Sequence, residues 1–278
     1  FLGSLFHDCL SKMYNEGFDL RTEYDKYLEK RELTNKEKFY VDNLYTTLEF
    51  IIKTIREQES KSMYDKTLTE TRLNLKKEGK ITINFLGFVD KIKYLEDNDG
   101  KYLVAIIDYK TGYVPTTLDN INYGLHLQLP VYIYLTKRGL HKDIKITGFY
   151  LQKILNGKTI DSDSLEEDSK KALKLDGYSI NSEEELIKFD KTYTKSDVIK
   201  GIATTSKGFA HYAKLFNDSD IEKIDRIVDE RINEVVLAIQ DGNFPINPKR
   251  VKGELIGCEF CKYKEICYRK EEDIVDLE

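Results

Sequence analysis

The sequence lacks the features that mark membrane and secreted proteins. No run of 18 apolar residues occurs, which excludes a transmembrane helix, and no secretory leader is recognisable. The 278 residues include only four histidines and four cysteines, too few for a histidine-rich two-metal site or a dense disulfide framework. We therefore expect a protein of the reducing cytoplasm without a membrane partner.

The sequence has no large excess of positive or negative charge, and it has no internal repeat. With 49 acidic and 44 basic residues the net charge is −5, so DNA binding would need a local basic groove or a larger complex. The sequence opens on Phe1 rather than methionine, inside an apolar-patterned segment. We interpret it as a fragment of a longer protein, long enough for one large domain.

Apolar spacing predicts helices and strands in mixed order. Residues 123–135 alternate like a strand, and Pro130 argues against a helix interior, although a proline is allowed in a first helical turn. Residues 156–206 are polar and irregular, and we expect an insertion or surface arm there rather than core. The other predicted elements are helices over 5–14, 35–58 and 219–241, the last with a Ser219–Glu222 capping box, and strands over 81–95, 102–109 and 144–155.

A predicted hairpin brings two carboxylates together. The Asp99-Gly100 pair favours a turn between strands 81–95 and 102–109, which places Asp90 within one position of Asp108. Opposed residues have Cβ atoms about 5 Å apart, so the two acids repel unless a cation lies between them. The alternation of this strand runs over odd-numbered residues before Gly87 and over even-numbered residues around and after it. This change predicts a bulge or sharp bend at Gly87 that orients Asp90.

Lys110 lies two residues after Asp108, on the same face of the strand. Mg²⁺ prefers hard oxygen ligands, and a lysine beside it supplies fixed positive charge to a phosphate. The alternative is a strand-end ion pair between Asp108 and Lys110. We predict a metal site with a catalytic lysine.

Four short motifs occur in one order along the chain. Together they resemble the RecB-type branch of the PD-(D/E)XK nuclease superfamily, with Val89 where many members have proline. The implied fold is α/β, a mixed central sheet flanked by helices in the order αβββαβ, with helical additions and a C-terminal cysteine segment. The motifs are Gly3-x-x-x-His7, Gly87-x-x-Asp90, Asp108-Tyr109-Lys110-Thr111-Gly112 and Gln128-x-x-x-Tyr132.

The resemblance implies a role for each motif residue and a helix over 123–135. The implied cofactor is Mg²⁺ or Mn²⁺. Gly3 is expected to allow close approach beside His7. The implied metal ligands are His7, Asp90, Asp108 and the Tyr109 backbone carbonyl, and the implied catalytic residues are Lys110, Asp108, Asp90, Gln128 and Tyr132.

Three cysteines near the end have metal-ligand spacing. Cys258-x-x-Cys261 and Cys267 suit zinc or an iron–sulfur cluster, whereas Cys9 shares a helix face with apolar residues and is expected in the core. The resemblance implies a [4Fe–4S] cluster in the full-length protein. Its fourth ligand is expected outside this sequence, which leaves the cluster absent or incomplete in this fragment.

Within the branch, the chain most resembles the nuclease domain of the AddB/RexB helicase–nuclease subunits. That implies Mg²⁺-dependent exonuclease action on unwound, single-stranded DNA ends in bacterial double-strand-break repair, with an AddA-type partner subunit. A stand-alone exonuclease of the kind associated with CRISPR adaptation, and a catalytically silent DNA-binding or assembly module, are the alternatives. We expect one nuclease domain over 1–278, with catalytic core 1–155, insertion 156–210, C-terminal helix 211–257 and cysteine segment 258–278.

Residues that contact DNA are harder to place from sequence. Lysines flank the first active-site strand, and three tyrosines have rings that could stack on bases. Charged strand ends are usually only solvated, so none of these enters the predicted site. The residues are Lys76, Lys77, Lys80, Lys91 and Lys93, with Tyr109, Tyr113 and Tyr123.

Overall fold

The structure is a computed structural model that describes residues 2–78, 82–112, 116–155, 163–258 and 261–277. It contains two compact units, the first formed by 1–117 and 128–225 and the second by 118–127 and 226–278. The boundary between the units at 225/226 lies inside a helix. The single nuclease domain over 1–278 and its segment limits stay predictions.

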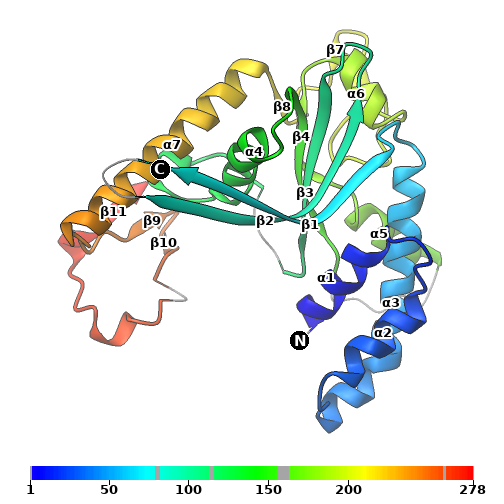
Figure 1. The fold of residues 1–278 in the computed structure, drawn as a ribbon, viewed down its shortest axis with the longest axis horizontal. Helices are drawn as coiled ribbons and strands as arrows, with labels where there is room; N and C mark the ends of the chain where they lie inside the picture. Colours follow the sequence, from blue (N-terminus) through cyan, green and yellow to red (C-terminus); the bar gives the residue numbers. More distant parts are fainter. Residues whose placement is uncertain (1, 79–81, 113–115, 156–162, 259–260, 278) are drawn as a thin grey trace. The chain divides into compact units, whose positions relative to one another are not determined.

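A six-stranded mixed sheet forms the centre of the first unit, in the order β1-β2-β3-β4-β5-β8 (Figure 1). The pairs β1–β2, β2–β3 and β4–β5 are antiparallel, and β3–β4 and β5–β8 are parallel. Residues 103–109 of β3 are all buried, which confirms the central strand predicted there. The strands are β1 Lys66–Lys77, β2 Ile83–Glu96, β3 Tyr102–Lys110, β4 Ile144–Lys153, β5 Asp176–Ile180 and β8 Leu215–Phe216.

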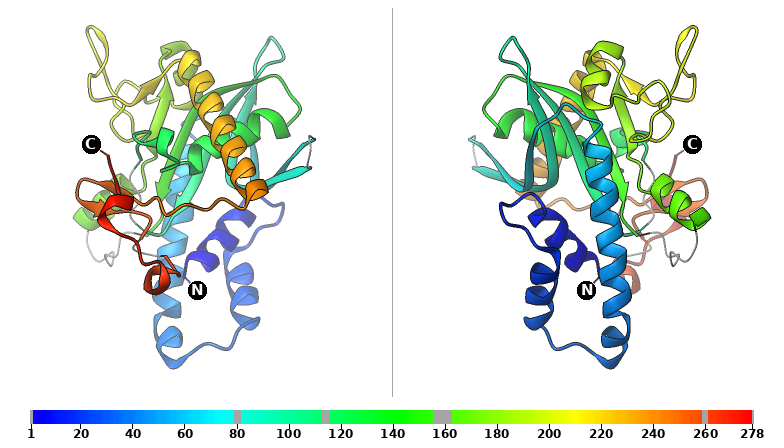
Figure 2. Two further views of the ribbon diagram at one scale, coloured as in Figure 1. Left: turned by 90° about the vertical axis from the view of Figure 1, so that its left-hand side faces the viewer. Right: turned by 90° about the vertical axis from the view of Figure 1, so that its right-hand side faces the viewer.

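Helices flank this sheet, as predicted. The helix α3 covers one face and α4 the other (Figures 1 and 2). Thr34 and Glu37 form a capping box that starts α3, whose buried stripe includes Leu48, Ile51 and Ile55; this confirms the helix predicted over 35–58. The helices of this unit are α1 Leu2–Lys12, α2 Leu20–Glu29, α3 Asn35–Glu59, α4 Gln128–Gly139, α5 Asp163–Ala172 and α6 Glu183–Phe189.

The strand interpretation of 123–135 is wrong. A helix, α4, begins at Gln128, and Pro130 is its third residue. Proline is tolerated there because the N–H groups of a first turn have no helical acceptor. Ile133, Tyr134 and Leu135 are buried together, and such a run can be part of a buried helix as well as of a strand.

The described part of 156–210 is not a surface arm. Its strand β5 pairs with β4, and β5 in turn pairs with β8, so this segment widens the central sheet. Leu186 and Phe189 of α6 are buried, as are Val198 and Ile199 in the following loop. The core residues of this segment lie between polar residues in short elements. Such elements are too short to show a regular apolar spacing, so the sequence did not predict them as core.

The strand β2 turns its odd-numbered residues to different helices along its length. Phe85 contacts Tyr134 of α4, with ring centroids 6.3 Å apart, whereas Lys91 pairs with Glu59 of α3 at 2.7 Å. The change occurs at Asp90, where the otherwise continuous β1–β2 register is interrupted and Glu70 of β1 has φ +45°. The predicted bulge at Gly87 is therefore wrong, because the side that the odd-numbered residues face changes three residues later, at Asp90.

Gly87 instead permits close packing of α4 on β2. A Cβ at this position would lie 2.4 Å from Cδ1 of Leu135, a distance that forces one of them to move. We expect Gly87→Ala to destabilise the chain by about 1–3 kcal/mol. The measurement is urea unfolding of Gly87→Ala, Leu135→Ala and the double variant. Because Leu135→Ala removes the clashing atom, the loss of unfolding free energy in the double variant should be smaller than the sum of the two single losses. A double loss equal to that sum would contradict this packing.

The second unit contains a three-stranded sheet in the order β10-β9-β11. Arg250 of β9 pairs with Asp276 of β11 at 3.1 Å and also with Glu271. The helix α7, Asp218–Asp241, begins in the first unit and ends in the second, which confirms the helix predicted over 219–241. Its strands are β9 Lys249–Val251, β10 Glu254–Leu255 and β11 Val275–Leu277.

The helix α7 begins with a cap other than the predicted one. The Asp220 carboxylate accepts the Asn217 backbone N–H at 2.8 Å, where a Ser219–Glu222 capping box was expected. Among all helices within the described ranges, none is long and apolar enough to cross a bilayer.

Candidate active site

The β2–β3 register brings Asp90 and Asp108 together. The last ladder pair is Lys91 with Ile107, so the next opposed positions are Asp90 and Asp108. Oδ2 of Asp90 accepts a hydrogen bond of 2.8 Å from the backbone N–H of Tyr109. Because the N–H and C=O of one strand residue point toward the same neighbouring strand, the Tyr109 carbonyl also faces β2. The structure thus places Asp90 opposite Asp108, as the predicted hairpin requires.

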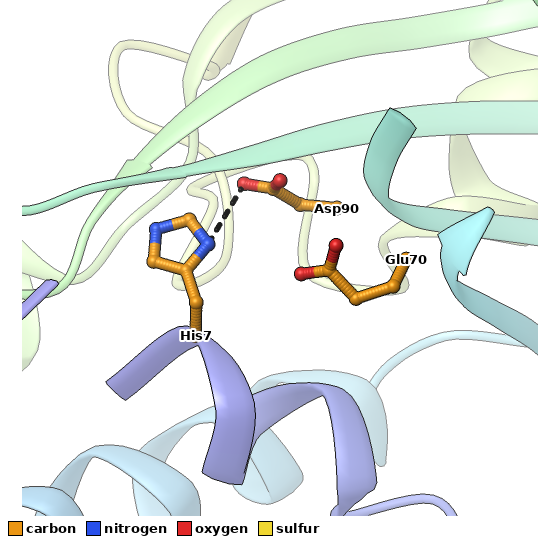
Figure 3. Close-up of side chains that lie close together, drawn as sticks. All are labelled: His7, Glu70 and Asp90. Carbon is orange, nitrogen blue, oxygen red and sulfur yellow. Dashed lines mark ion pairs between the residues drawn. The ribbon is translucent and has the colours of Figure 1, made fainter. Parts of the chain in front are cut away.

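Three side chains from three elements gather at Asp90. His7 of α1, Glu70 of β1 and Asp90 of β2 point toward one another (Figure 3), and one ligand atom from each lies within 4.8 Å of the others. Nδ1 of His7 is 3.5 Å from Oδ2 of Asp90. One imidazole nitrogen and two carboxylates form a donor set suited to Mn²⁺ or Mg²⁺. No other group of three His, Cys, Asp or Glu residues in the described chain is as close.

Glu70 is the residue that sequence reasoning missed. It lies in β1, a strand that the sequence analysis did not predict, at the position that the β1–β2 register places opposite Asp90. Its φ of +45° is uncommon for a residue with a side chain. The only signal in the sequence is the alternation of residues 66–77, and pairing that strand with 83–94 would have placed Glu70 beside Asp90.

An open cleft of about 760 Å³ lies beside this cluster. His7, Glu70 and Asp90 form part of its wall, with Tyr27 and Arg31 on or just after α2. The guanidinium of Arg31 lies over the Tyr27 ring, 5.0 Å from its centroid. Gly3 also lines the cleft, but a Cβ there would be 3.6 Å from Thr111, an ordinary contact. Among the described residues no strand therefore requires a glycine at this position, and close approach of Gly3 to a metal stays a prediction.

Lys110 belongs to a second polar group at the end of β3. Its Nζ lies 2.5 Å from Oδ2 of Asp108 and donates to Oε1 of Gln128 at 2.6 Å. Nε2 of Gln128 donates to Oδ1 of Asp108 at 2.8 Å and to Oη of Tyr132 at 3.1 Å. Gln128 and Tyr132 are four residues apart on α4, so one helix face holds both. The structure thus gathers the lysine with the residues predicted near it.

The two aspartates are electrostatically strained without a cation. Burial raises the pKa of Asp108 to about 6, and the charge on Asp90 adds to the rise, while Lys110 opposes it. Burial likewise raises the pKa of Asp90, although His7 and the Tyr109 N–H lower it. Oδ2 of Asp108 is buried and its nearest cationic partner is the Lys110 ammonium, 2.5 Å away. A cation between the carboxylates would relieve the repulsion between them.

The hydroxyl of Tyr132 stays protonated in this environment. Burial raises its pKa to about 12, with the hydrogen bond from Gln128 opposing the rise. It is therefore a neutral group near pH 7, able to donate a proton in a hydrogen bond but not to act as a base.

Most residues considered for DNA contact lie elsewhere. Lys91 and Lys93 are buried and pair with Glu59 at 2.7 and 3.3 Å, so they support the core beneath the site. The Tyr109 side chain is also buried and cannot stack on a base. Tyr123 is exposed in the second unit, and Lys80 and Tyr113 lie outside the described residues.

The cysteine segment has no gathered ligand set in the described chain. Cys258, Cys261 and Cys267 are free thiols, and they do not form a group of the kind seen at His7. Cys9 is fully buried in α1, and burial raises its pKa to about 12, which confirms the prediction of a core cysteine. A neutral buried thiol is a poor metal ligand, since the thiolate is the form that binds.

The chain matches known nucleases over nearly its full length. A family model described as the PD-(D/E)XK nuclease superfamily matches residues 1–268. A protein of Carboxydothermus hydrogenoformans, named as the B-subunit of an ATP-dependent helicase/deoxyribonuclease, is 24% identical over 265 residues, covering 89% of this chain and 24% of that protein.

Two further relatives carry the same name. The Thermoanaerobacter sp. protein is 28% identical over 194 residues, and one from Clostridium botulinum is 26% identical over 196 residues. Each match covers 66% of this chain and 17% of the relative. The chain therefore corresponds to about a quarter or less of the length of these relatives.

Proposed function

Because this chain belongs to the PD-(D/E)XK nuclease superfamily, we propose that it is a metal-dependent deoxyribonuclease domain that hydrolyses phosphodiester bonds of single-stranded DNA ends. The observation that carries the proposal is the convergence of Asp90, Asp108 and Lys110 with His7 and Glu70. A catalytically silent module has no need of a buried acidic pair that costs free energy without a cation.

We assign the metal to His7, Asp90, Asp108 and the Tyr109 carbonyl, with Glu70 as an additional oxygen donor. A bound Mg²⁺ or Mn²⁺ supplies a Lewis acid for the phosphoryl oxygen and lowers the pKa of a bound water. The proposed cofactor suits a site that combines carboxylates with one imidazole.

Lys110 places positive charge where charge develops on the phosphate. Asp108 and Gln128 hold its Nζ at 2.5 and 2.6 Å, so the ammonium is oriented before substrate arrives. The Gln128 amide in turn is held by Tyr132. We propose that Gln128 and Tyr132 are positioning residues that keep the lysine and Asp108 in register.

The relatives support a more specific assignment. Their name, as B-subunits of a helicase/deoxyribonuclease, motivates the proposal that this domain belongs to an AddB-type subunit that acts with an AddA-type partner in bacterial double-strand-break repair. The exonuclease character and the cytoplasmic location are parts of the same proposal. A stand-alone exonuclease of this branch is the other candidate, favoured only by the shared motifs.

We also propose that Cys258, Cys261 and Cys267 supply three ligands of a [4Fe–4S] cluster. The spacing supports the proposal, and the buried Cys9 is excluded as the fourth ligand by its environment. Iron and sulfide content of the full-length protein after anaerobic reconstitution is the test. Cys261→Ala should reduce bound iron, whereas zinc bound in place of iron would contradict the assignment.

The proposed activity is tested by cleavage of end-labelled single-stranded DNA with Mg²⁺ or Mn²⁺. We expect Lys110→Ala to reduce the rate by roughly 10²- to 10³-fold, the usual effect of losing one preorganised positive or donor group. Lys38→Ala, an exposed lysine on α3, is the matched control and should retain the wild-type rate.

The same assay separates the alternatives. Metal-dependent cleavage of linear but not circular single strands supports an exonuclease. DNA binding without metal-dependent cleavage would favour the silent module, and equal cleavage by wild type and Lys110→Ala would remove the proposed role of the lysine.

A further inference from the structure

The strands β1 and β2 continue beyond the metal-ligand cluster as a two-stranded ribbon. Pairing of β2 with β3 begins at Lys91, whereas its pairing with β1 continues to Lys77 opposite Ile83. One side of this ribbon packs on α4. Leu73 is buried against Gly139, and Gly87 lies beneath Leu135. Phe85 also contacts Tyr134 of α4, so odd-numbered residues of both strands face this helix.

The other side of the ribbon is exposed and carries two large apolar side chains. Phe88 is 50% exposed and Leu86 is 45% exposed. Arg72 lies directly opposite Phe88, and Asn74 lies opposite Leu86. Within β1 and β2 the even positions beyond the cluster hold no carboxylate: they are Arg72, Asn74, Lys76, Asn84, Leu86 and Phe88.

This exposed side leads directly to the metal-ligand cluster. Glu70 and Asp90 lie two residues further along the strands from Arg72 and Phe88, at the gap in the β1–β2 register. At about 3.4 Å per residue, Phe88 lies about 7 Å along the strand from Asp90, and Leu86 about 14 Å. An exposed aromatic, a neighbouring arginine and a metal-ligand cluster therefore follow one another along one strand pair.

We propose that the exposed side of the β1–β2 ribbon is a stacking platform that binds single-stranded DNA and leads it to the metal-ligand cluster. A base stacks on Phe88, the Leu86 side chain supports the next base, and Arg72 contacts the phosphate backbone. Aromatic faces with adjacent cations are the usual means of binding single strands without sequence preference. The proposal rests on the proposed function and names the path of its substrate.

A protein partner is the other possible occupant of an exposed apolar side. Two features favour DNA. The substrate of a nuclease must reach the metal-ligand cluster, which lies further along the same two strands. Lys76 pairs at 2.7 Å with Glu78, just beyond β1, so Arg72 beside Phe88 is the cation that suits a polyanion.

The test compares two oligonucleotides of equal length, oligo-dT and an abasic strand with the same backbone. Fluorescence anisotropy is measured in the Lys110→Ala background so that the strand is not cut. The platform predicts that dT binds roughly tenfold more tightly than the abasic strand, and that Phe88→Ala removes this preference. Phe88→Tyr should retain it, and Phe39→Ala, an exposed phenylalanine on α3, is the matched control.

Two further measurements distinguish a loss of base stacking from a loss of the folded site. With an otherwise native site, Phe88→Ala should leave hydrolysis of bis(p-nitrophenyl) phosphate unchanged, because this small diester need not reach the ribbon. Arg72→Ala should reduce the slope of log affinity against log salt by about 0.7, the effect of one lost phosphate contact on a single strand.

Equal dT binding by Phe88→Ala and its parent overturns the platform, and so does loss of small-diester hydrolysis along with DNA binding. The proposed function fails separately: if the native chain hydrolyses neither substrate but keeps a Phe88-dependent preference for dT, the platform stands without the nuclease.

Discussion

Asp108→Asn is expected to stabilise the metal-free chain and at the same time abolish cleavage. The pKa of Asp108 is raised to about 6 by burial and by the nearby Asp90 charge, against an ordinary value near 4. A difference of about two in pKa corresponds to roughly 3 kcal/mol of unfolding free energy. The neutral asparagine removes this cost but cannot replace a charged metal ligand.

The sign of the pH dependence follows from the raised pKa. The folded wild type binds the Asp108 proton more tightly than the unfolded chain does, so its stability falls as the pH rises from about 4 through about 6. Asp108→Asn lacks this fall. We expect the two chains to be equally stable at pH 4 and to differ by up to roughly 3 kcal/mol at pH 8.

Urea unfolding at pH 4, 6 and 8, with EDTA and with Mn²⁺, measures both effects. Mn²⁺ should raise the stability of the wild type at pH 8 and leave Asp108→Asn nearly unchanged, because the proton and the metal compete for one carboxylate. Cleavage should fall by at least about 10²-fold. A wild-type stability that is the same at pH 4 and pH 8 in EDTA would contradict the predicted electrostatic strain.

Glu59→Gln is expected to be the most destabilising single substitution among those considered. Glu59 pairs with Lys91 and Lys93, which are 2% and 6% exposed, and accepts the Tyr14 hydroxyl at 2.6 Å. Burial alone would raise the pKa of Glu59, but the two ammonium groups outweigh it and lower the pKa to about 2. Without the carboxylate, two buried positive charges have no counter-ion, which costs about 3–5 kcal/mol.

Glu57→Gln on the same helix is the control for Glu59→Gln. Glu57 pairs with Lys170 at 3.1 Å, and both side chains are substantially exposed. An exposed pair contributes little, so unfolding free energy should change by less than about 0.5 kcal/mol. Similar losses in the two variants, measured as urea midpoints, would show that Glu59 does not hold a buried charge cluster.

The candidate catalytic motif and the main secondary structure can be predicted from local pattern. Asp108 and Lys110 lie at the end of a continuously apolar strand, and the Asp99-Gly100 turn sets the register that brings Asp90 beside Asp108. These features depend on spacing of a few residues, so strand geometry and turn chemistry are sufficient to predict them. The α3 and α7 helices follow in the same way from a regular apolar stripe.

Other parts of the site depend on contacts between segments far apart in sequence. Glu70 joins the cluster because β1 pairs with β2 and departs from regular geometry at Asp90, and Lys91 and Lys93 become core residues because Glu59 of α3 reaches them. Likewise α4 is a helix because its buried side packs on Gly87 and Leu73, although its residues alternate as a strand would. Spacing along the chain determines which side chains share a face; which distant helix or strand covers that face depends on packing, and local pattern contains no information about it.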